Sequence, residues 1–332
     1  MAEDSSVRRP ETVYQPYRKT LLSARRIEEL SKLRPAVAVR DMVLCWCVIV
    51  CAWAMVAFHT TWWTVLLAIP IVGTRAYALM ILAHDGMHRR LFPGFRANDL
   101  FSDLFIVGSF GAINRINNRN HLAHHRLLTL TVDPDRYKYS CLNKNTPLKL
   151  VGYLIGGHVA LSIWNVLVGS NKSSAKSEQR GYTLRDLAIL VGWQGILWTA
   201  GVHFIGWWAV PVLWYFPFFS FALLGDNFRT FAEHTQPEPD EVGDTHRLIT
   251  FDSNPIERLF FAPFNMNYHT VHHLWTSIPY YNLPTADAEI RDNPAAVGLE
   301  WRKSYIGFLI RYWLSLPIKG CGERREGKAI RS

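Results

Sequence analysis

Nine of the 13 histidines in this 332-residue chain fall in groups whose spacing suits metal binding. The stretches AHDGMH, NHLAHH and YHTVHH each hold two or three of them, and FAEHT holds one more. In chain order they are His84, His88, His121, His124, His125, His234, His269, His272 and His273. Residues three and four apart lie on one face of a helix, so each group can point its imidazoles at a single place.

The chemistry open to these groups is metal chemistry, because neutral imidazole binds zinc, iron, copper and nickel. One tetrahedral zinc needs at most four ligands, so nine histidines exceed a single zinc site. They could instead supply four or five nitrogens to each of two metal ions. The other histidines are isolated, and we expect them to be surface or hydrogen-bonded residues: His59, His158, His203 and His246.

Long apolar segments flank the histidine groups. Residues 42–58, 61–83, 187–205 and 207–225 are almost continuously apolar. A membrane-spanning helix needs roughly 17–25 such residues. A very short linker joins the first two segments, and another joins the last two, so each pair should form a helical hairpin.

Composition and charge agree with a membrane protein that has a large polar part. Charged residues make up 19% of the chain, and the mean hydropathy is only +0.01, too low for a protein made of spans alone. The net charge of +9 comes largely from Arg and Lys beside the apolar segments, which is the distribution expected on the cytoplasmic side of a membrane. No nucleic-acid-binding motif is present, so we exclude nucleic acid as a partner.

The sequence therefore predicts an all-α integral membrane fold with two transmembrane hairpins of about four spans, interfacial helices and a histidine-rich helical cap. Residues 100–113 and 148–169 are candidates for interfacial helices, and whether the latter crosses the membrane is left open. We expect residues 1–41 to be a cytoplasmic segment, 42–318 a single domain and 319–332 a basic tail. Both hairpins return the chain to its starting side, so both termini and all the histidine groups should be cytoplasmic.

The three histidine clusters resemble the histidine boxes of the membrane fatty acid desaturase superfamily: H-x-x-x-H at 84–88 and H-x-x-H-H at 121–125 and 269–273. The stretches HHRLLTLTVDPDRY and HHLWTSIPYYNLP are similar to the sequences around and after the second and third boxes in that superfamily. The resemblance covers about residues 75–290. It implies a membrane-embedded helical fold, two irons and O2-dependent oxidation of C–H bonds. It also implies that the eight box histidines are iron ligands, and that His234 is the extra ligand upstream of the third box.

Polar residues beside the boxes are candidates for orienting the ligands. Asp85 could accept a hydrogen bond from a ligand imidazole, although it could equally cap a helix. Glu233, beside His234, and Asp226 are candidates of the same kind. Asn227 and Arg229 could line the site or the substrate entrance.

Two other positions near the boxes are expected to contribute less. In some members of the superfamily an Asn four residues before the extra histidine reaches the metal through water, and Thr230 stands at that position here. Asp133 and Asp135, in the stretch DPDRY, are expected to form a turn.

Oxidation of an unactivated C–H bond needs a strong oxidant, which a redox metal and O2 can supply. The sequence has no G-x-G-x-x-G after a strand and no C-x-x-C-H, so we expect electrons from a partner such as ferredoxin or a cytochrome b5-like protein. We predict desaturation of a fatty acyl or lipid chain that enters from the bilayer. Hydroxylation or ketolation of a lipid, carotenoid or small metabolite is the alternative within the superfamily. A membrane zinc hydrolase would leave most of the histidines without a role. A metal transporter would not explain why the histidines lie outside the predicted spans.

Overall fold

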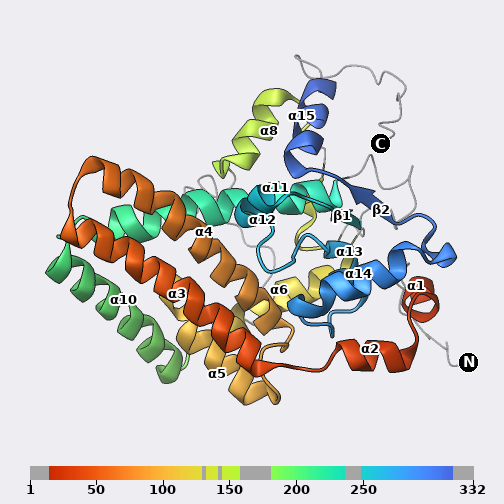
Figure 1. The fold of residues 1–332 in the computed structure, drawn as a ribbon, viewed down its shortest axis with the longest axis horizontal. Helices are drawn as coiled ribbons and strands as arrows, with labels where there is room; N and C mark the ends of the chain where they lie inside the picture. Colours follow the sequence, from red (N-terminus) through yellow and green to blue (C-terminus); the bar gives the residue numbers. More distant parts are fainter. Residues whose placement is uncertain (1–14, 129–131, 141–143, 158–180, 236–247, 317–332) are drawn as a thin grey trace, which may run out of the picture.

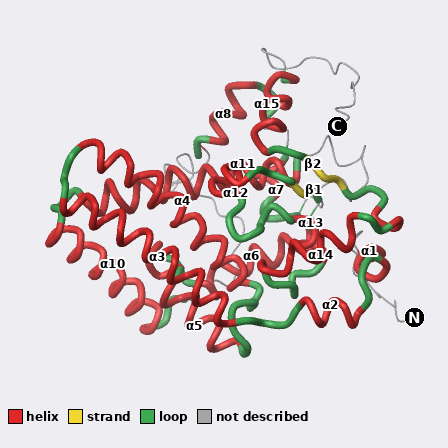
Figure 2. The backbone as a smooth tube through the Cα atoms, viewed as in Figure 1, coloured by secondary structure: helices red, strands yellow, loops and turns green. Residues whose placement is uncertain are grey.

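The chain folds into a bundle of long apolar helices joined to a cap of shorter elements (Figures 1 and 2). The computed structural model describes residues 15–128, 132–140, 144–157, 181–235 and 248–316. Within these ranges, three helices, α3, α4 and α10, are long and apolar enough to cross a membrane. The predicted helical membrane fold is confirmed at this level, while the fourth span and the cytoplasmic side of the cap remain predictions.

The first predicted hairpin is present as α3 (Pro35–Phe58) and α4 (Trp62–Met87), which pack along one another. Pro35 stands in the first turn of α3, where a missing N–H costs no helical hydrogen bond. Thr61 caps α4 together with Thr64. α4 continues past the predicted end at residue 83, so His84 belongs to its last turn.

The second apolar pair is less regular than the first. It consists of α10 (Leu184–Phe204), the π-helical turns η3 (Pro211–Tyr215) and η4 (Phe218–Ala222), and α11 (Leu223–His234). Within the predicted span 207–225, the N–H of Phe216 bonds the carbonyl of Pro211, five residues back. Pro217 then has no N–H for the carbonyl of Leu213, which favours the same wider turn. This segment is therefore helical, although its winding is not that of a regular α-helix.

Four short elements pack against the long helices or α11: α5 (Phe95–Phe105) and η1 (Val107–Phe110) against α4, and α8 (Pro147–Leu154) and α15 (Tyr305–Ser315) against α11. Each is too short to cross a bilayer. Phe95, Leu148 and Leu314 expose large apolar side chains on them, as expected for interfacial helices. The apolar run 148–169 continues into residues that lie outside the described ones, so its membrane crossing stays a prediction.

The cap lies at the right of Figure 1 and is built from short helices and one pair of strands. Its helices are α1 (Gln15–Thr20), α2 (Ala24–Leu30), α6 (Asn114–Leu127), α7 (Arg136–Tyr139), α12 (Pro255–Phe261), α13 (His269–Leu274), η6 (Tyr280–Asn282), α14 (Leu283–Arg291) and η7 (Pro294–Ala296).

The two strands, β1 (Ile249–Phe251) and β2 (Glu300–Arg302), pair in parallel, with Ile249 opposite Glu300. The all-α prediction missed this pair because a three-residue strand is too short to show an alternating pattern. β1 precedes the third histidine group in the chain and β2 follows it, so their pairing closes the segment that carries this group.

α4 and α11 approach so closely that their contact leaves no room for a side chain at Gly225. A Cβ there would lie 2.8 Å from Cε1 of Tyr77 and 2.8 Å from the carbonyl oxygen of Phe260. The Tyr77 hydroxyl donates to the carbonyl of Phe261 at 2.9 Å, which ties α12 to the same place. This contact brings the C-terminal ends of α4 and α11, which carry His84 and His234, toward one another.

Candidate metal centre

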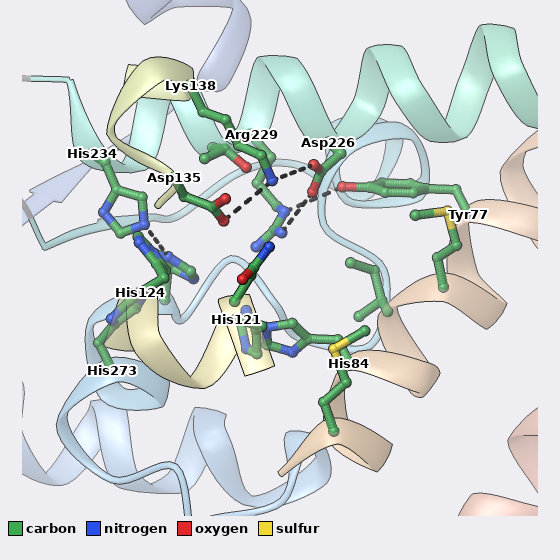
Figure 3. Close-up of a pocket in the computed structure, with 16 residues that line it drawn as sticks. Tyr77, His84, His121, His124, Asp135, Lys138, Asp226, Arg229, His234 and His273 are labelled. Atoms are coloured by element: carbon green, nitrogen blue, oxygen red, sulfur yellow. Dashed lines mark hydrogen bonds and ion pairs between the residues drawn. The ribbon is translucent and has the colours of Figure 1, made fainter. Parts of the chain in front are cut away.

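The helices that carry the nine histidines end at one place (Figure 3). Seven of the nine lie in the last turn or at the C-cap of a helix: His84 and His88 on α4, His124 and His125 on α6, His234 on α11, and His272 and His273 on α13. The C-terminal end of a helix carries a partial negative charge, which favours a bound cation. His121 and His269 lie on the same faces of α6 and α13, three residues earlier.

A first group contains five histidines, each with a ring nitrogen within 4.8 Å of a ring nitrogen of every other: His84, His88, His121, His125 and His272. The Nε2 atoms of His88 and His121 are 2.7 Å apart, and those of His121 and His125 are 3.0 Å apart. His272 Nε2 lies 3.2 Å from His125 Nε2. Five converging nitrogens can surround one metal ion.

A second group adjoins the first. His124, His234 and His273 have ring nitrogens within 4.8 Å of one another, and His269 Nε2 lies 2.8 Å from His234 Nε2. The ring centroids of His125 and His273 are 4.1 Å apart, so the two groups share a wall. The nine histidines thus divide into groups of five and four.

Burial keeps these imidazoles in the form that binds metal. It lowers the pKa of His88 to about 3, and together with neighbouring imidazoles it lowers the pKa of five others well below the ordinary value: His121, His125, His269, His272 and His273. A neutral imidazole is the metal-binding form. Among the described residues, Nδ1 of His84 and Nε2 of His273 are buried without a hydrogen-bond partner, which costs about 1–3 kcal/mol each. Neutral rings with unsatisfied nitrogens fit bound cations, so the two groups could hold metal ions.

Asp133 holds His124 in place. Its carboxylate lies 2.9 Å from Nδ1 of His124 and accepts a hydrogen bond from the Tyr139 hydroxyl at 2.5 Å. It also accepts from the backbone N–H of Asp135 at 2.9 Å, so the predicted turn is present, but a turn alone was an incomplete interpretation. A carboxylate on one ring nitrogen fixes the tautomer and orientation of a metal-binding histidine. The sequence signal was only an acidic residue shortly after the second box.

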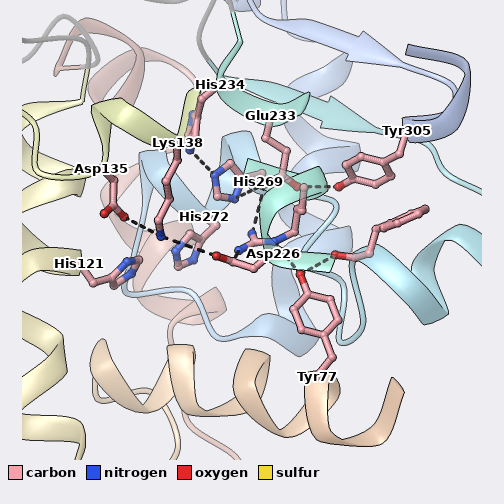
Figure 4. A network of polar contacts seen from close by, with 12 residues as sticks. Tyr77, His121, Asp135, Lys138, Asp226, Glu233, His234, His269, His272 and Tyr305 are labelled. Carbon is pink, nitrogen blue, oxygen red and sulfur yellow. Dashed lines mark hydrogen bonds and ion pairs between the residues drawn. The ribbon is translucent and has the colours of Figure 1, made fainter. Parts of the chain in front are cut away.

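Glu233 lies against His269 instead of His234, its neighbour in the chain (Figure 4). Its Oε2 atom is 3.3 Å from Nδ1 of His269. The carboxylate accepts hydrogen bonds from the Tyr305 hydroxyl at 2.6 Å and from Nη1 of Arg229 at 3.2 Å. Glu233 therefore stands behind a predicted ligand, and two buried donors fix its position.

Two other predicted orienting residues have different partners. Asp85 accepts a hydrogen bond from the backbone N–H of Tyr280 at 2.9 Å, and Asn227 donates to the carbonyls of Tyr153 and Leu154 at 3.3 and 3.4 Å. In the described parts of the chain, Asp85 hydrogen bonds to no imidazole, so the first of its two predicted roles is not seen. Asn227 was expected to line the site or the substrate entrance, and its amide instead contacts α8. Asp85 ties the loop after α13 to α4, and Asn227 ties α8 to α11.

A cavity of about 250 Å³ opens onto both histidine groups (Figure 3). Met80, Ile81 and Met87 of α4 line one side of it. The other residues of its wall outside the histidines are polar or aromatic: Tyr77, Asn120, Asp135, Lys138, Asp226, Arg229 and Thr230. Arg229 thus lines the site as predicted. Asp226 lies in the wall as well, paired with Arg229 and Lys138.

The isolated histidines lie elsewhere. His59 is the exposed C-cap of α3, and His203 is exposed in the last turn of α10. Both agree with the interpretation of these residues as ordinary surface groups. His158 and His246 lie outside the described residues.

Comparison with known proteins decides the family. The family model described as fatty acid desaturase matches residues 60–305, which is most of the chain. The chain belongs to the fatty acid desaturase family. The matched residues of this desaturase-family protein include all three boxes and His234, and the resemblance seen in the sequence is confirmed.

Individual relatives of this desaturase-family protein differ in the activities that their names describe. It is 27% identical to a dihydrorhizobitoxine desaturase of Bradyrhizobium elkanii over 82% of each chain. It is 25% identical to a beta-carotene ketolase of Paracoccus sp. (strain N81106 / MBIC 01143), over 71% of this chain and 88% of the relative. It is 24% identical to an sn-1 acyl-lipid omega-3 desaturase (ferredoxin) of Nostoc sp. (strain 36), over 66% of this chain and 65% of the relative. These relatives support a lipid-modifying oxidoreductase at the level of the family.

Proposed function

We propose that the protein is an O2-dependent oxidase with two irons that introduces a double bond into its substrate. The observation that carries this proposal is the pair of adjoining histidine groups, which contain five and four imidazoles and face one cavity. Imidazole suits iron, and two bound irons would supply the redox chemistry that C–H oxidation needs. A single zinc would leave at least five of these imidazoles without a role.

The residues around the centre have distinct tasks in this proposal. The nine histidines hold the metal, while Asp133 and Glu233 orient His124 and His269 from behind. Tyr139 and Tyr305 donate to these two carboxylates and keep them in place. Burial of the ligands excludes bulk water, which protects a strongly oxidising centre from side reactions.

The membrane location belongs to the same proposal. α4 carries the first box at the end of a helix long enough to cross a bilayer, so the centre would lie at the membrane surface. The basic residues beside the spans support a cytoplasmic position for the cap and both termini. The substrate predicted from the sequence is a fatty acyl or lipid chain.

An electron donor such as ferredoxin or a cytochrome b5-like protein would have direct access to the centre. A second depression, of about 360 Å³, has His88 and His125 in its wall together with Arg18 and Arg126. Arg18 also donates to the carbonyl of His273 at 3.0 Å. The two arginines complement an acidic donor, and docking there would place its redox group close to the ligands of the first group.

Hydroxylation or ketolation is the second candidate, supported by the ketolase among the relatives. The experiment that decides uses iron-loaded protein with a chemical reductant, O2 and candidate substrates. A product that has lost two hydrogens supports desaturation, and one that has gained oxygen supports the alternative. Zinc as the bound metal with no oxygen uptake would contradict both.

A further inference from the structure

The cavity described above is where a substrate would have to lie. Among the described residues, it is lined by members of the first histidine group, His84 and His121, and by all four members of the second. A carbon atom that is to be oxidised must come within contact distance of the metal centre. The residues that line this cavity therefore indicate the size and polarity of the substrate.

One wall of the cavity carries two cations and two carboxylates (Figures 3 and 4). Lys138 Nζ lies 3.3 Å from Asp135 and 3.6 Å from Asp226. Arg229 Nη2 lies 3.1 Å from the same Asp226. The Lys138 side chain is only 22% exposed and that of Arg229 only 6%. The apolar lining residues of the cavity, Met80, Ile81 and Met87, all come from α4.

A long hydrocarbon chain would fit this cavity poorly. Laying methylene groups against the ionic wall would remove the remaining water from partly exposed charged side chains and return no hydrogen bond, which disfavours such a chain. The volume is also small. A cavity of about 150 Å³ holds benzene, so about 250 Å³ suits a molecule of roughly ten non-hydrogen atoms.

The signs of the charges narrow the choice of ligand further. The wall presents both cations and carboxylates to the cavity, with Glu233 pairing Arg229 from behind at 3.2 Å, so a ligand that carries a single charge can pair with only part of the wall. A ligand with one cationic and one anionic group can pair with the wall in both senses. Its anionic group would meet Lys138 and Arg229, and its cationic group would meet Asp135 and Asp226.

We propose that the substrate is a small zwitterion with a short carbon chain, its charged groups held by Lys138, Arg229, Asp135 and Asp226 and its chain lying along Met80, Ile81 and Met87 over the histidines. This proposal rests on the proposed function, because it assigns the substrate of that same metal centre. It replaces the long acyl chain predicted from the sequence with a compact polar molecule.

Binding to zinc-loaded protein tests the proposal without oxidation. Full-length protein in detergent is titrated calorimetrically with 2-aminohexanoic acid, with hexanoic acid and hexan-1-amine, which each keep one of its charges, and with octadecanoic acid. We expect 2-aminohexanoic acid to bind at least about tenfold more tightly than either singly charged analogue. Saturable binding of octadecanoic acid together with no binding of 2-aminohexanoic acid would overturn the proposal.

Matched variants show whether the ionic wall is responsible. Lys138→Met should weaken binding of 2-aminohexanoic acid about tenfold or more, and Lys138→Arg should retain it. Lys149→Met makes the same change on an exposed lysine of α8 outside the cavity and should leave binding unchanged. If Lys138→Met keeps its zinc content and still binds as tightly as the unaltered protein, the ionic wall has no role and the proposal fails.

The metal content of the same samples separates this proposal from the proposed function. Protein that takes up fewer than two zinc ions per chain speaks against a two-metal centre, whatever it binds. Protein with two zinc ions that prefers the long acyl chain keeps the two-metal centre and rejects the zwitterion.

Discussion

Asp133 and His124 face one another at 2.9 Å, with the carboxylate on the ring nitrogen Nδ1. This contact leaves Nε2 of His124 to point into the second histidine group. Tyr139 and the N–H of Asp135 hold the carboxylate from two other directions. The ligand geometry of the second group therefore depends on a residue nine positions further along the chain.

Removing the Asp133 carboxylate should loosen the metal in the second group. Carboxylate partners of metal-binding histidines are worth about 10–100-fold in affinity, so Asp133→Ala should lose one metal per chain to a chelator that leaves the unaltered protein loaded. Asp292→Ala removes an exposed carboxylate of the cap and serves as the control. Equal metal retention by the two variants would show that Asp133 does not support a ligand.

Glu233→Gln should destabilise the fold more than Tyr305→Phe does. Glu233 pairs with the buried Arg229 at 3.2 Å, and Arg229 keeps Asp226 at 3.1 Å in the variant, so we expect part of the about 3–5 kcal/mol that a fully unpaired buried charge costs. Tyr305→Phe removes one hydrogen bond to the same carboxylate, with a loss of about 1 kcal/mol. Thermal unfolding of the two variants in detergent checks the order. A larger effect of Tyr305→Phe would mean that Arg229 is neutralised by other groups.

Gly225→Ala should push α4 and α11 apart. The added methyl would meet Tyr77 and the carbonyl of Phe260 at 2.8 Å, and overpacking of this kind costs about 1–3 kcal/mol. Because these helices position His84 and His234, metal content should fall along with the unfolding temperature. Gly192→Ala, at a position on α10 with open space around its Cβ, should change neither. A Gly225→Ala protein with normal stability would contradict the close contact.

Acid should release the metal and destabilise the fold in the same pH range. Burial lowers the pKa of His121, His272 and His273 in the folded chain, whereas an unfolded histidine titrates near about pH 6.5. Below about pH 6.5 the unfolded chain therefore binds more protons than the folded one, so stability falls as the pH falls. Metal per chain after dialysis between pH 7.5 and 5 gives the measurement. An unfolding temperature that does not fall between pH 7.5 and 5 would contradict the burial of neutral imidazoles in the folded chain.

Arg126→Glu should slow electron delivery without altering the metal centre. Arg126 lines the depression that reaches His88 and His125, and a reversed charge there repels an acidic donor. Turnover with reduced ferredoxin should drop and lose its salt dependence, while turnover with dithionite stays unchanged. Arg311→Glu places the same change on the exposed face of α15. An identical response of the two variants would exclude this face as the docking site.

The sequence predicted the parts of the centre that follow a local period. His121, His124 and His125 are spaced to share a helix face, and the long apolar runs predicted α3, α4 and α10. Contacts between distant segments left no such pattern. The approach of Asp85 to Tyr280, of Glu233 to His269 and of Asn227 to Tyr153 depends on how helices pack, so the sequence did not predict these partners. The ionic wall of the cavity was missed for the same reason, since Lys138 and Asp226 come from different helices.

Iron content per chain tests whether the histidines form two metal sites. Protein reconstituted anaerobically with iron is analysed alongside His121→Ala, His273→Ala and His203→Ala, which alter the first group, the second group and an exposed histidine of α10. We expect two irons for the unaltered protein and for His203→Ala, and about one for each of the other two variants. One iron in the unaltered protein, or two in both box variants, would contradict this expectation.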